Sequence, residues 1–347
     1  MKQGKVVTID GRHGEGGGQI LRTALTLSAL SGVPLHIHHI RGNRKKPGLR
    51  PQHLTAAQAL ARITGARLEG ATIGSCELVF EPGTITGGNY SFQIGTAGST
   101  GLALQTIIPV LLFGKTPSQI QVTGGTHVPW SPSFHYLEEI FTPTLKKMGG
   151  VVSFEIEQWG WYPKGGGSVI SKIDNTQGLT AIQLFDRGKL FDLHILSAVS
   201  NLPLSIAERQ RDQALERVYH LGLSPYIRIE DAPSRGQGTV LFLAARFEGS
   251  TGGFTSLGRK GKRAEAVADH ACNEFLNFLN SKGVIDAHLS DQLVLYMALA
   301  HGRSTLITET ITDHLLTNVW VIEQFTPVKF NVEQKTGKIA VNGMGFQ

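Results

Sequence analysis

Cysteine, charge and aromatic residues are all scarce in this chain of 347 residues. It has only two cysteines, Cys76 and Cys272, and they form no CxxC pair. This excludes a cysteine zinc site and fits a reducing compartment. There is no apolar run long enough to cross a bilayer and no basic-then-apolar leader with a cleavage site. We therefore expect a cytoplasmic protein that makes no use of a membrane.

The aromatic share is 7%, and no RNP-type strand is present. Both facts argue against a plain RNA-binding module, because such modules present aromatic platforms for stacked bases. Charged residues make up only 17% of the chain, yet the formal net charge is +6. That balance favours an anionic partner such as a nucleic acid or a nucleotide. The 41% of hydrophobic residues and 42 glycines predict a large core with many tight turns.

An internal repeat is the most informative feature of the sequence. The stretch "GEGGGQILRTALTLSALSG" at 14–32 has the form of "GTAGSTGLALQTIIPVLLFG" at 95–114: a glycine cluster followed by an apolar helix pattern. Each is followed by a second segment, at 50–69 and at 131–155, in which a proline opens an amphipathic helix that ends in a glycine turn and a strand.

A third copy closes the chain. It has a first helix at 289–302, a second at 312–325, and a hairpin around Lys335–Thr336–Gly337. We therefore predict an α+β fold in which three repeated βαβαββ-type units form a large domain from residues 1–185 and 285–347. The segment 186–284 lacks the pattern and is predicted to be a small inserted α/β domain.

The glycines of "HGEGGGQILRTAL" stand in front of a helix N-terminus, which offers free N–H groups and partial positive charge to a phosphate. No Gly-Lys-Ser follows, so this is not a Walker motif, and a plain glycine turn is at least as good an interpretation. Glu15 beside such a turn suits a phosphate only if a divalent cation lies between them. Its alternative role is to complement the helix dipole.

The loop "RGNRKKPGLRPQH" carries a run of positive charge. Its members are Arg41, Arg44, Lys45, Lys46 and Arg50, followed by Gln52 and His53. The run is either a clamp for phosphate oxygens or a solvated face, and the two interpretations weigh about equally. Arg22, on the neighbouring predicted helix, could point at the same anion.

Two more polar positions invite a ligand or a structural partner. In "HLSDQ" at 288–292, Asp291 either caps the helix that follows or belongs to a short polar loop that contacts a ribose or base. Gln105 stands alone in an apolar helix and needs a partner in the protein or in a ligand.

Most of the thirteen histidines need no special role. In "HIHHI", at 36–40, we expect His36 and His38 to lie on an exposed strand face without a nearby carboxylate, which argues against a metal site. No local motif signals a Ser-His-Asp or Cys-His triad. His314, at the start of the second helix of the third unit, is either a packed histidine or the residue that carries the chemistry.

Taken together, six stretches resemble one family over essentially the whole chain, the RNA 3′-terminal phosphate cyclases. They are "GEGGGQILRTAL", "RGNRKKPGLRPQH", "GTAGSTGLALQTIIP", "YPKGGGSV", "HLSDQ" and "HLLTN". The resemblance implies three repeated units with a small inserted domain. It also implies an ATP-dependent conversion of an RNA 3′-terminal phosphate to a 2′,3′-cyclic phosphate, through a covalent histidine–AMP intermediate and an RNA adenylate.

The resemblance makes His314 the nucleophile and Glu15 the ligand of a divalent metal, Mg²⁺ or Mn²⁺. It implies that phosphate and nucleotide binding falls to Arg22, Arg41, Arg44, Gln52, His53, Gln105, His288, Leu289, Ser290, Asp291 and Gln292. A neutral imidazole is a competent nucleophile near pH 7, and a P–N bond stays reactive enough to pass its group on.

One position departs from the family pattern, because Trp159 stands where a basic residue is usual. It lies in an expected structural turn, and its expected effect is on RNA-end binding. Two rival interpretations remain. A non-catalytic relative in ribosome assembly is disfavoured by the presence of His314 and the arginine loop. An enolpyruvyl-transferase-like enzyme is disfavoured because it needs six units and a longer chain.

Overall fold

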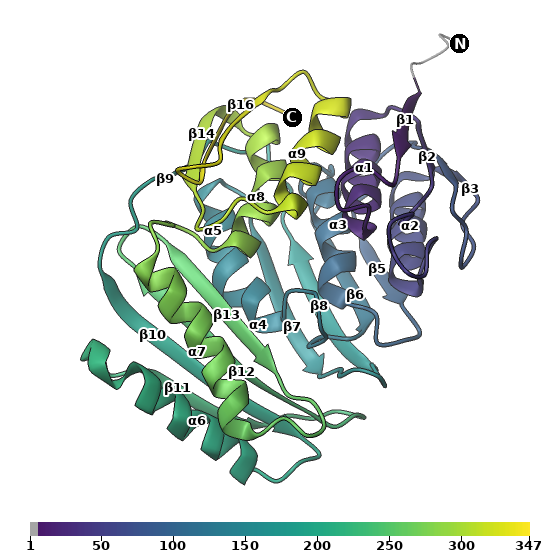
Figure 1. Cartoon of the computed structure of the whole chain (residues 1–347). Coiled ribbons are helices and arrows are strands. Elements are labelled where there is room, and N and C mark those ends of the chain that lie inside the picture. Colours follow the sequence, from purple (N-terminus) through teal and green to yellow (C-terminus); the bar gives the residue numbers. More distant parts are fainter. Residues whose placement is uncertain (1–5) are drawn as a thin grey trace.

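The structure is a computed structural model and describes residues 6–347. It is a mixed α+β fold with four four-stranded sheets, each of which contains one parallel and two antiparallel strand pairs. Within the described residues, no helix combines the length and the apolar character needed to cross a membrane. Figure 1 shows the helices packed between and against these sheets.

The first two sheets have the same construction. The first has the order β1-β2-β4-β3 and the second β5-β6-β8-β7. The elements of the first are β1 (Val7–Asp10), α1 (Gly18–Ser31), β2 (Leu35–His38), α2 (Pro51–Thr64), β3 (Arg67–Glu69) and β4 (Leu78–Glu81). Those of the second are β5 (Asn89–Gln93), α3 (Thr100–Leu112), β6 (Ser118–Gly124), α4 (Phe134–Tyr136), η1 (Leu137–Phe141), α5 (Thr142–Lys147), β7 (Val152–Gln158) and β8 (Gly167–Ile173).

The third sheet follows the same pairing scheme but draws on distant parts of the chain. Its order is β15-β16-β14-β9, and β9 runs parallel to β14. The elements are β9 (Gln183–Leu184), α8 (Ala287–Leu299), β14 (His301–Ile307), α9 (Asp313–Phe325), β15 (Phe330–Glu333) and β16 (Lys338–Met344). The hairpin expected around Lys335–Gly337 is confirmed as β15–β16.

The fourth sheet, of order β11-β10-β12-β13, lies between β9 and α8 in the chain. Its elements are β10 (Leu190–Ser200), α6 (Ser205–Val218), η2 (Tyr219–Leu221), β11 (Tyr226–Asp231), β12 (Gly238–Phe247), β13 (Thr251–Leu257) and α7 (Ala264–Asn280). The strands and helices expected in 186–284 are present, and β11 and β13 were not foreseen. A second hydrophobic core, between this sheet and α6 and α7, gathers around Leu243, Phe254 and Phe275.

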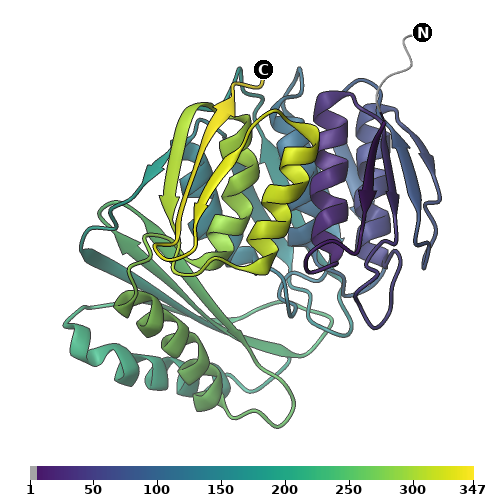
Figure 2. The same cartoon turned by 45° about the horizontal axis from the view of Figure 1, so that its top comes forward.

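The larger core holds helices that contact one another across the sequence. Helix α1 packs against α9, and α2 packs against α3; Figure 2 shows α1 beside α9. Every residue of α1 from Ile20 to Leu30 is buried. Apart from Arg22, the polar residues in this stretch are threonines and a serine, which are small enough to pack inside the core. These contacts bring the first and last parts of the chain together at the ends where α1 and α9 begin.

The second helical segment of the second sheet is not the single regular helix expected from the sequence. It runs through α4 and α5 with one wide π-type turn, η1, between them. Pro143 follows that turn, and it has no N–H to donate to the carbonyl four residues earlier. The Leu137 carbonyl accepts from both the backbone N–H and the hydroxyl of Thr142, the hydroxyl at 2.9 Å.

Candidate functional site

His314 lies in the first turn of α9 and faces a carboxylate from α8. Its ring Nδ1 is 3.1 Å from Oδ2 of Asp291, an ion-pair distance, but the pair does not meet hydrogen-bond geometry. Thr312 caps α9 by accepting from the Leu315 N–H, and its hydroxyl donates to Oδ1 of Asp291 at 2.9 Å. The side chain of His314 is 35% exposed and that of Asp291 12%. Nδ1 therefore faces a shielded carboxylate while the ring keeps access to solvent.

The segment 288–292 is helical, which corrects the expectation of a polar loop there. Helix α8 begins at Ala287 and is capped by Asp286, not by Asp291. Leu289 is fully buried, and the Ser290 hydroxyl donates to the carbonyl of Ala287 at 2.8 Å. These two side chains therefore serve packing within α8. His288 is exposed, and Gln292 is partly buried with a shielded Oε1 that has no partner among the described residues.

The glycine turn before α1 lies against α9, one helical turn beyond His314. The N–H of Glu15 donates to Oγ1 of Thr317 at 3.4 Å. Gly14 has a φ of +53°, and a Cβ there would stand 2.4 Å from Oγ1 of Thr317, so no other residue fits without a shift. Deeper along the same helix pair, Thr23 donates to Oδ1 of Asn318 at 2.5 Å. Asn318 in turn donates to the backbone carbonyl of Asp291 at 2.8 Å, which links α1, α9 and α8.

Arg22 and His53 meet at the start of α1. Both are almost fully buried, and a Cβ on Gly18 would lie 2.3 Å from Nε2 of His53 and 3.1 Å from Nη1 of Arg22. Burial lowers the pKa of Arg22 to about 10, so it stays charged at neutral pH. Burial, with Arg22 and two further arginines nearby, lowers the pKa of His53 to about 3. Its Nδ1 accepts the Arg50 N–H at 3.2 Å, so the neutral ring carries its hydrogen on Nε2.

Arg41 and Arg44, two of the three arginines in the 41–50 loop, have different surroundings. Arg41 donates through Nη1 to the carbonyls of Lys46 and Gly48, at 2.7 and 3.0 Å, and so closes its own loop. Arg44 is 43% exposed and forms an ion pair with Oε1 of Glu15. Arg41 also has a left-handed backbone, with a φ of +56°, which turns the chain sharply at the start of the loop. Arg44 is therefore the more available of the two for an anion.

The two glutamines expected at a nucleotide lie near α3. Oε1 of Gln52 accepts the N–H of Ser99 at 2.9 Å, directly before the first turn of α3. Gln52 therefore joins the start of α2 to the start of α3. Gln105 is partly buried on α3, and among residues 6–347 no hydrogen bond connects it to His314.

Glu15 offers one carboxylate to a metal. Mg²⁺ and Mn²⁺ are commonly held by one or two carboxylates, with water and substrate phosphates completing the shell. In this structure the contact with Arg44 uses Oε1 alone. The donor set fits a hard divalent ion that arrives with a phosphate ligand, and it fits an all-protein cage poorly.

Two expectations are corrected by the structure. Trp159 is 1% exposed and stacks on His127 with ring centroids 4.1 Å apart, so it forms part of the packing and not of a surface that meets RNA. The histidines of β2 do have a carboxylate nearby, because Asp10 of β1 pairs with His38 in register. Asp10, His38 and His39 offer ligand atoms that all lie within 4.8 Å of one another. No sequence pattern indicates this cluster, since it depends on which strands become neighbours.

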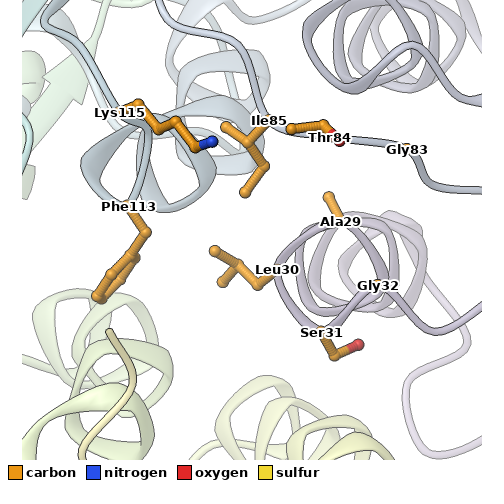
Figure 3. A pocket seen from close by; sticks show the side chains of 9 residues that line it. All are labelled: Ala29, Leu30, Ser31, Gly32, Gly83, Thr84, Ile85, Phe113 and Lys115. Carbon is orange, nitrogen blue, oxygen red and sulfur yellow. The ribbon is translucent and has the colours of Figure 1, made fainter.

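A hollow of about 300 Å³ lies at the other end of α1 (Figure 3). Its lining includes Leu30, Phe113 and Lys115. Helix α1 has 14 residues and spans roughly 21 Å at 1.5 Å per residue, so its two ends are well separated. None of the residues expected at the chemical site lines this hollow.

The sequence and the fold were compared with those of known proteins. The family model described as RNA 3′-terminal phosphate cyclase matches residues 13–332. A relative from Pyrobaculum aerophilum named RNA 3′-terminal phosphate cyclase is 44% identical over 98% of this chain and 99% of its own. One of the same name from Ralstonia nicotianae is 44% identical over 94% and 93%. The solved enolpyruvyl transferase NikO from Streptomyces tendae aligns over 98% of this chain and 48% of its own, at 10% identity and a TM-score of 0.40, too low to carry an argument.

Proposed function

The chain belongs to the RNA 3′-terminal phosphate cyclase family, and we propose that it is an enzyme that uses ATP to convert an RNA 3′-terminal phosphate to a 2′,3′-cyclic phosphate. The observation that carries the proposal is the position of His314 at the start of α9, with Nδ1 against the shielded Asp291 carboxylate. A non-catalytic relative has no need of such a pair.

The His314–Asp291 pair supports a role for Nε2 as the attacking atom. An imidazole that carries its hydrogen on Nδ1, facing a carboxylate, leaves a lone pair on Nε2. The carboxylate holds the ring in that tautomer and stabilises the positive charge that develops as the ring attacks. In this proposal Asp291 is a positioning residue, and Thr312 and Asn318 hold it in turn through its side-chain and backbone oxygens.

The first step forms a bond from Nε2 of His314 to the α-phosphorus of ATP and breaks the bond to pyrophosphate, which leaves. In the second step an oxygen of the RNA 3′-phosphate takes the AMP group, and the P–N bond to His314 breaks. The neighbouring ribose 2′-OH then attacks the activated phosphorus of the RNA, loses its proton and expels AMP. The first two steps transfer AMP from an oxygen to nitrogen and back to an oxygen, and the third exchanges one P–O bond for another, so the protein mainly has to position reactants and neutralise charge.

The buried cation of Arg22 and the N-terminus of α1 supply positive charge without solvent screening. Neutral His53 presents an N–H on Nε2 to the same space, so it offers a hydrogen bond without adding a charge that burial would oppose. Arg44 is proposed as the phosphate contact of the 41–50 loop, and Arg41 as its internal support. Gln52 and Gln105, with the exposed edge of α8 that carries His288 and Gln292, are proposed to bind the nucleotide.

A divalent ion, Mg²⁺ or Mn²⁺, would supply charge neutralisation on the phosphates when bound, with Glu15 as its protein ligand. An ion on Glu15 would compete with Arg44 for this carboxylate, and Arg44 could then turn toward phosphate oxygens. Release of one surface ion pair has a small free-energy cost, of about 1 kcal/mol or less.

We also propose that the fold consists of three copies of one unit and an inserted domain at 186–284. Three of the sheets share one strand order, in which the first, second, fourth and third strands of the unit lie side by side, whereas the fourth sheet has the order β11-β10-β12-β13. The residues of the second hydrophobic core all fall between Leu190 and Leu279, inside the proposed insertion.

The decisive experiment is to incubate the protein with ATP labelled at the α-phosphate and Mg²⁺ or Mn²⁺, without RNA, and then to denature it. An acid-labile, alkali-stable adduct that maps to His314 is expected. A chase with an RNA that ends in a 3′-phosphate should discharge the label and yield a 2′,3′-cyclic end. If no adduct forms with either metal, the non-catalytic alternative is favoured.

A further inference from the structure

The carboxyl ends of two parallel strands bring three metal-binding side chains together. Strands β1 and β2 pair with Asp10 opposite His38, and His39 follows directly. Nδ1 of His38 lies 2.8 Å from Nδ1 of His39, which lies 3.3 Å from Oδ1 of Asp10. All three side chains converge on one exposed spot at the edge of the first sheet, outside the residues that the proposed reaction uses.

These spacings suit a bound ion. Ligand atoms around a tetrahedral zinc are roughly 3.3 Å apart, since each metal–ligand bond is about 2.0–2.1 Å. The present distances reach those values with small side-chain rotations. Two imidazole nitrogens and one carboxylate oxygen select a borderline transition metal, whereas Mg²⁺ and Ca²⁺ prefer oxygen ligands throughout.

The backbone conformation of His39 is unusual and supports the metal-site interpretation. His39 has a φ of +51°, a left-handed conformation that is unfavourable for a residue with a Cβ. An extended backbone would alternate the side chains of His38 and His39 to opposite faces. The left-handed turn is therefore accompanied by two adjacent histidine rings on the same side, with centroids 4.6 Å apart.

We infer that Asp10, His38 and His39 form a binding site for one divalent transition-metal ion, such as Zn²⁺, Co²⁺ or Ni²⁺. Three protein ligands leave at least one position of the ion to water. The site is separate from the Glu15 carboxylate, which pairs with Arg44. The glycine turn begins directly after Asp10 and the arginine loop directly after His39 and Ile40, so the ion would cross-link the starting points of both loops.

Arg12 is the competitor for this site. It donates three hydrogen bonds to the Asp10 carboxylate, from its backbone N–H at 3.0 Å, from Nε at 3.1 Å and from Nη2 at 2.7 Å. These charge-assisted contacts occupy both carboxylate oxygens, so Arg12 and a bound cation compete for Asp10. The Arg12 side chain is 54% exposed and can turn toward solvent, and its positive charge weakens metal binding as long as it stays.

The test uses the full-length protein and Co²⁺ as a spectroscopic probe, without ATP or RNA, so it is independent of the proposed function. Equilibrium dialysis counts bound Co²⁺, and visible spectra report nitrogen ligands. The wild type should bind one more Co²⁺ than the His38→Ala/His39→Ala double variant. Asp10→Asn should bind that ion at least about tenfold more weakly. Arg12→Ala should bind it more tightly.

The matched control is His36→Ala, on the same strand. Its Nε2 lies 2.6 Å from Oε1 of Glu77, outside the three-residue group, so the variant should keep the extra ion. The inference is overturned if the double variant binds as much Co²⁺ as the wild type, or if His36→Ala loses the ion as fully as the double variant does. Either result leaves Asp10, His39 and His38 as a chain of hydrogen bonds. Circular dichroism of every variant verifies that the fold is kept.

Discussion

Nδ1 of His314 and Oδ2 of Asp291 lie 3.1 Å apart although the two residues come from different helices, α9 and α8. The carboxylate is mostly shielded, whereas the imidazole keeps about a third of its surface exposed. In the proposed mechanism, Asp291 is the residue that orients His314 and selects its tautomer. This role motivates the first prediction.

Asp291→Asn should slow adduct formation from labelled ATP by about 10²–10⁴-fold, because an amide donor facing Nδ1 favours the tautomer that blocks Nε2. Thermal stability should change little, since the backbone carbonyl that accepts from Asn318 remains. Thr312→Val is the graded companion: it removes one hydrogen bond to Asp291 and should cost about tenfold or less. If Asp291→Asn reacts at the wild-type rate but binds ATP weakly, Asp291 contacts the nucleotide and not the histidine.

His314→Ala should abolish both the covalent adduct and RNA cyclisation, with a loss of at least about 10³-fold. Its melting temperature should stay within a few degrees of the wild type, because the partly exposed ring makes no hydrogen bond that the helix needs. His301→Ala replaces another histidine, an exposed one on β14, and should keep full activity. Cyclisation by His314→Ala would contradict the assignment.

Substitution of Arg41 and of Arg44 should have different effects, one on stability and the other on ATP binding. Arg44→Ala should weaken ATP binding by about tenfold or more without lowering the melting temperature, because its exposed side chain makes a surface ion pair with Glu15, and such pairs add little stability. Arg41→Ala should lower the melting temperature, because two loop carbonyls lose their donor. ATP titration combined with thermal unfolding distinguishes the variants. Equal melting temperatures with equal activities would refute the division of roles.

Buried histidines should make the protein sensitive to acid. The pKa of His53 falls to about 3 in the folded protein through burial and nearby arginines, from about 6.5 when unfolded. Between those values the unfolded chain binds the extra proton, so the free energy of unfolding decreases as pH falls, by about 1.4 kcal/mol per pH unit for one such group. Above pH 6.5 this contribution is constant. Burial acts on His135 in the same direction.

His53→Asn removes one titrating group, so it should reduce the stability loss between pH 6.5 and pH 5 by roughly 2 kcal/mol. Urea unfolding at the two pH values measures the difference. His301→Asn is the control and should show the same loss as the wild type. A His53→Asn protein with an undiminished loss would place the acid sensitivity elsewhere.

Local patterns in the sequence predicted much of the secondary structure, because the signals act over a few residues. The glycine turn before α1, the helix from 312 to 325 and the hairpin at 335–337 each depend on such neighbours. The π-type turn before Pro143 was missed because the proline removes one donor without abolishing the helical pattern around it. The order of the motifs also sufficed to predict the family, since six weak signals in one order are jointly specific.

Tertiary structure decided every relationship between distant residues. The contact between His314 and Asp291 depends on how α8 packs beside α9, and the cap at Asp286 is set by its buried contacts with Tyr136 and Gly253. No periodicity encodes that Asp10 stands opposite His38, because strand pairing is a property of the assembled sheet. The sequence by itself determined which chemical groups are present and in which local elements they lie. Packing decided which of those groups meet, because side chains far apart in the chain are brought together only when the apolar faces of their helices and sheets share a core.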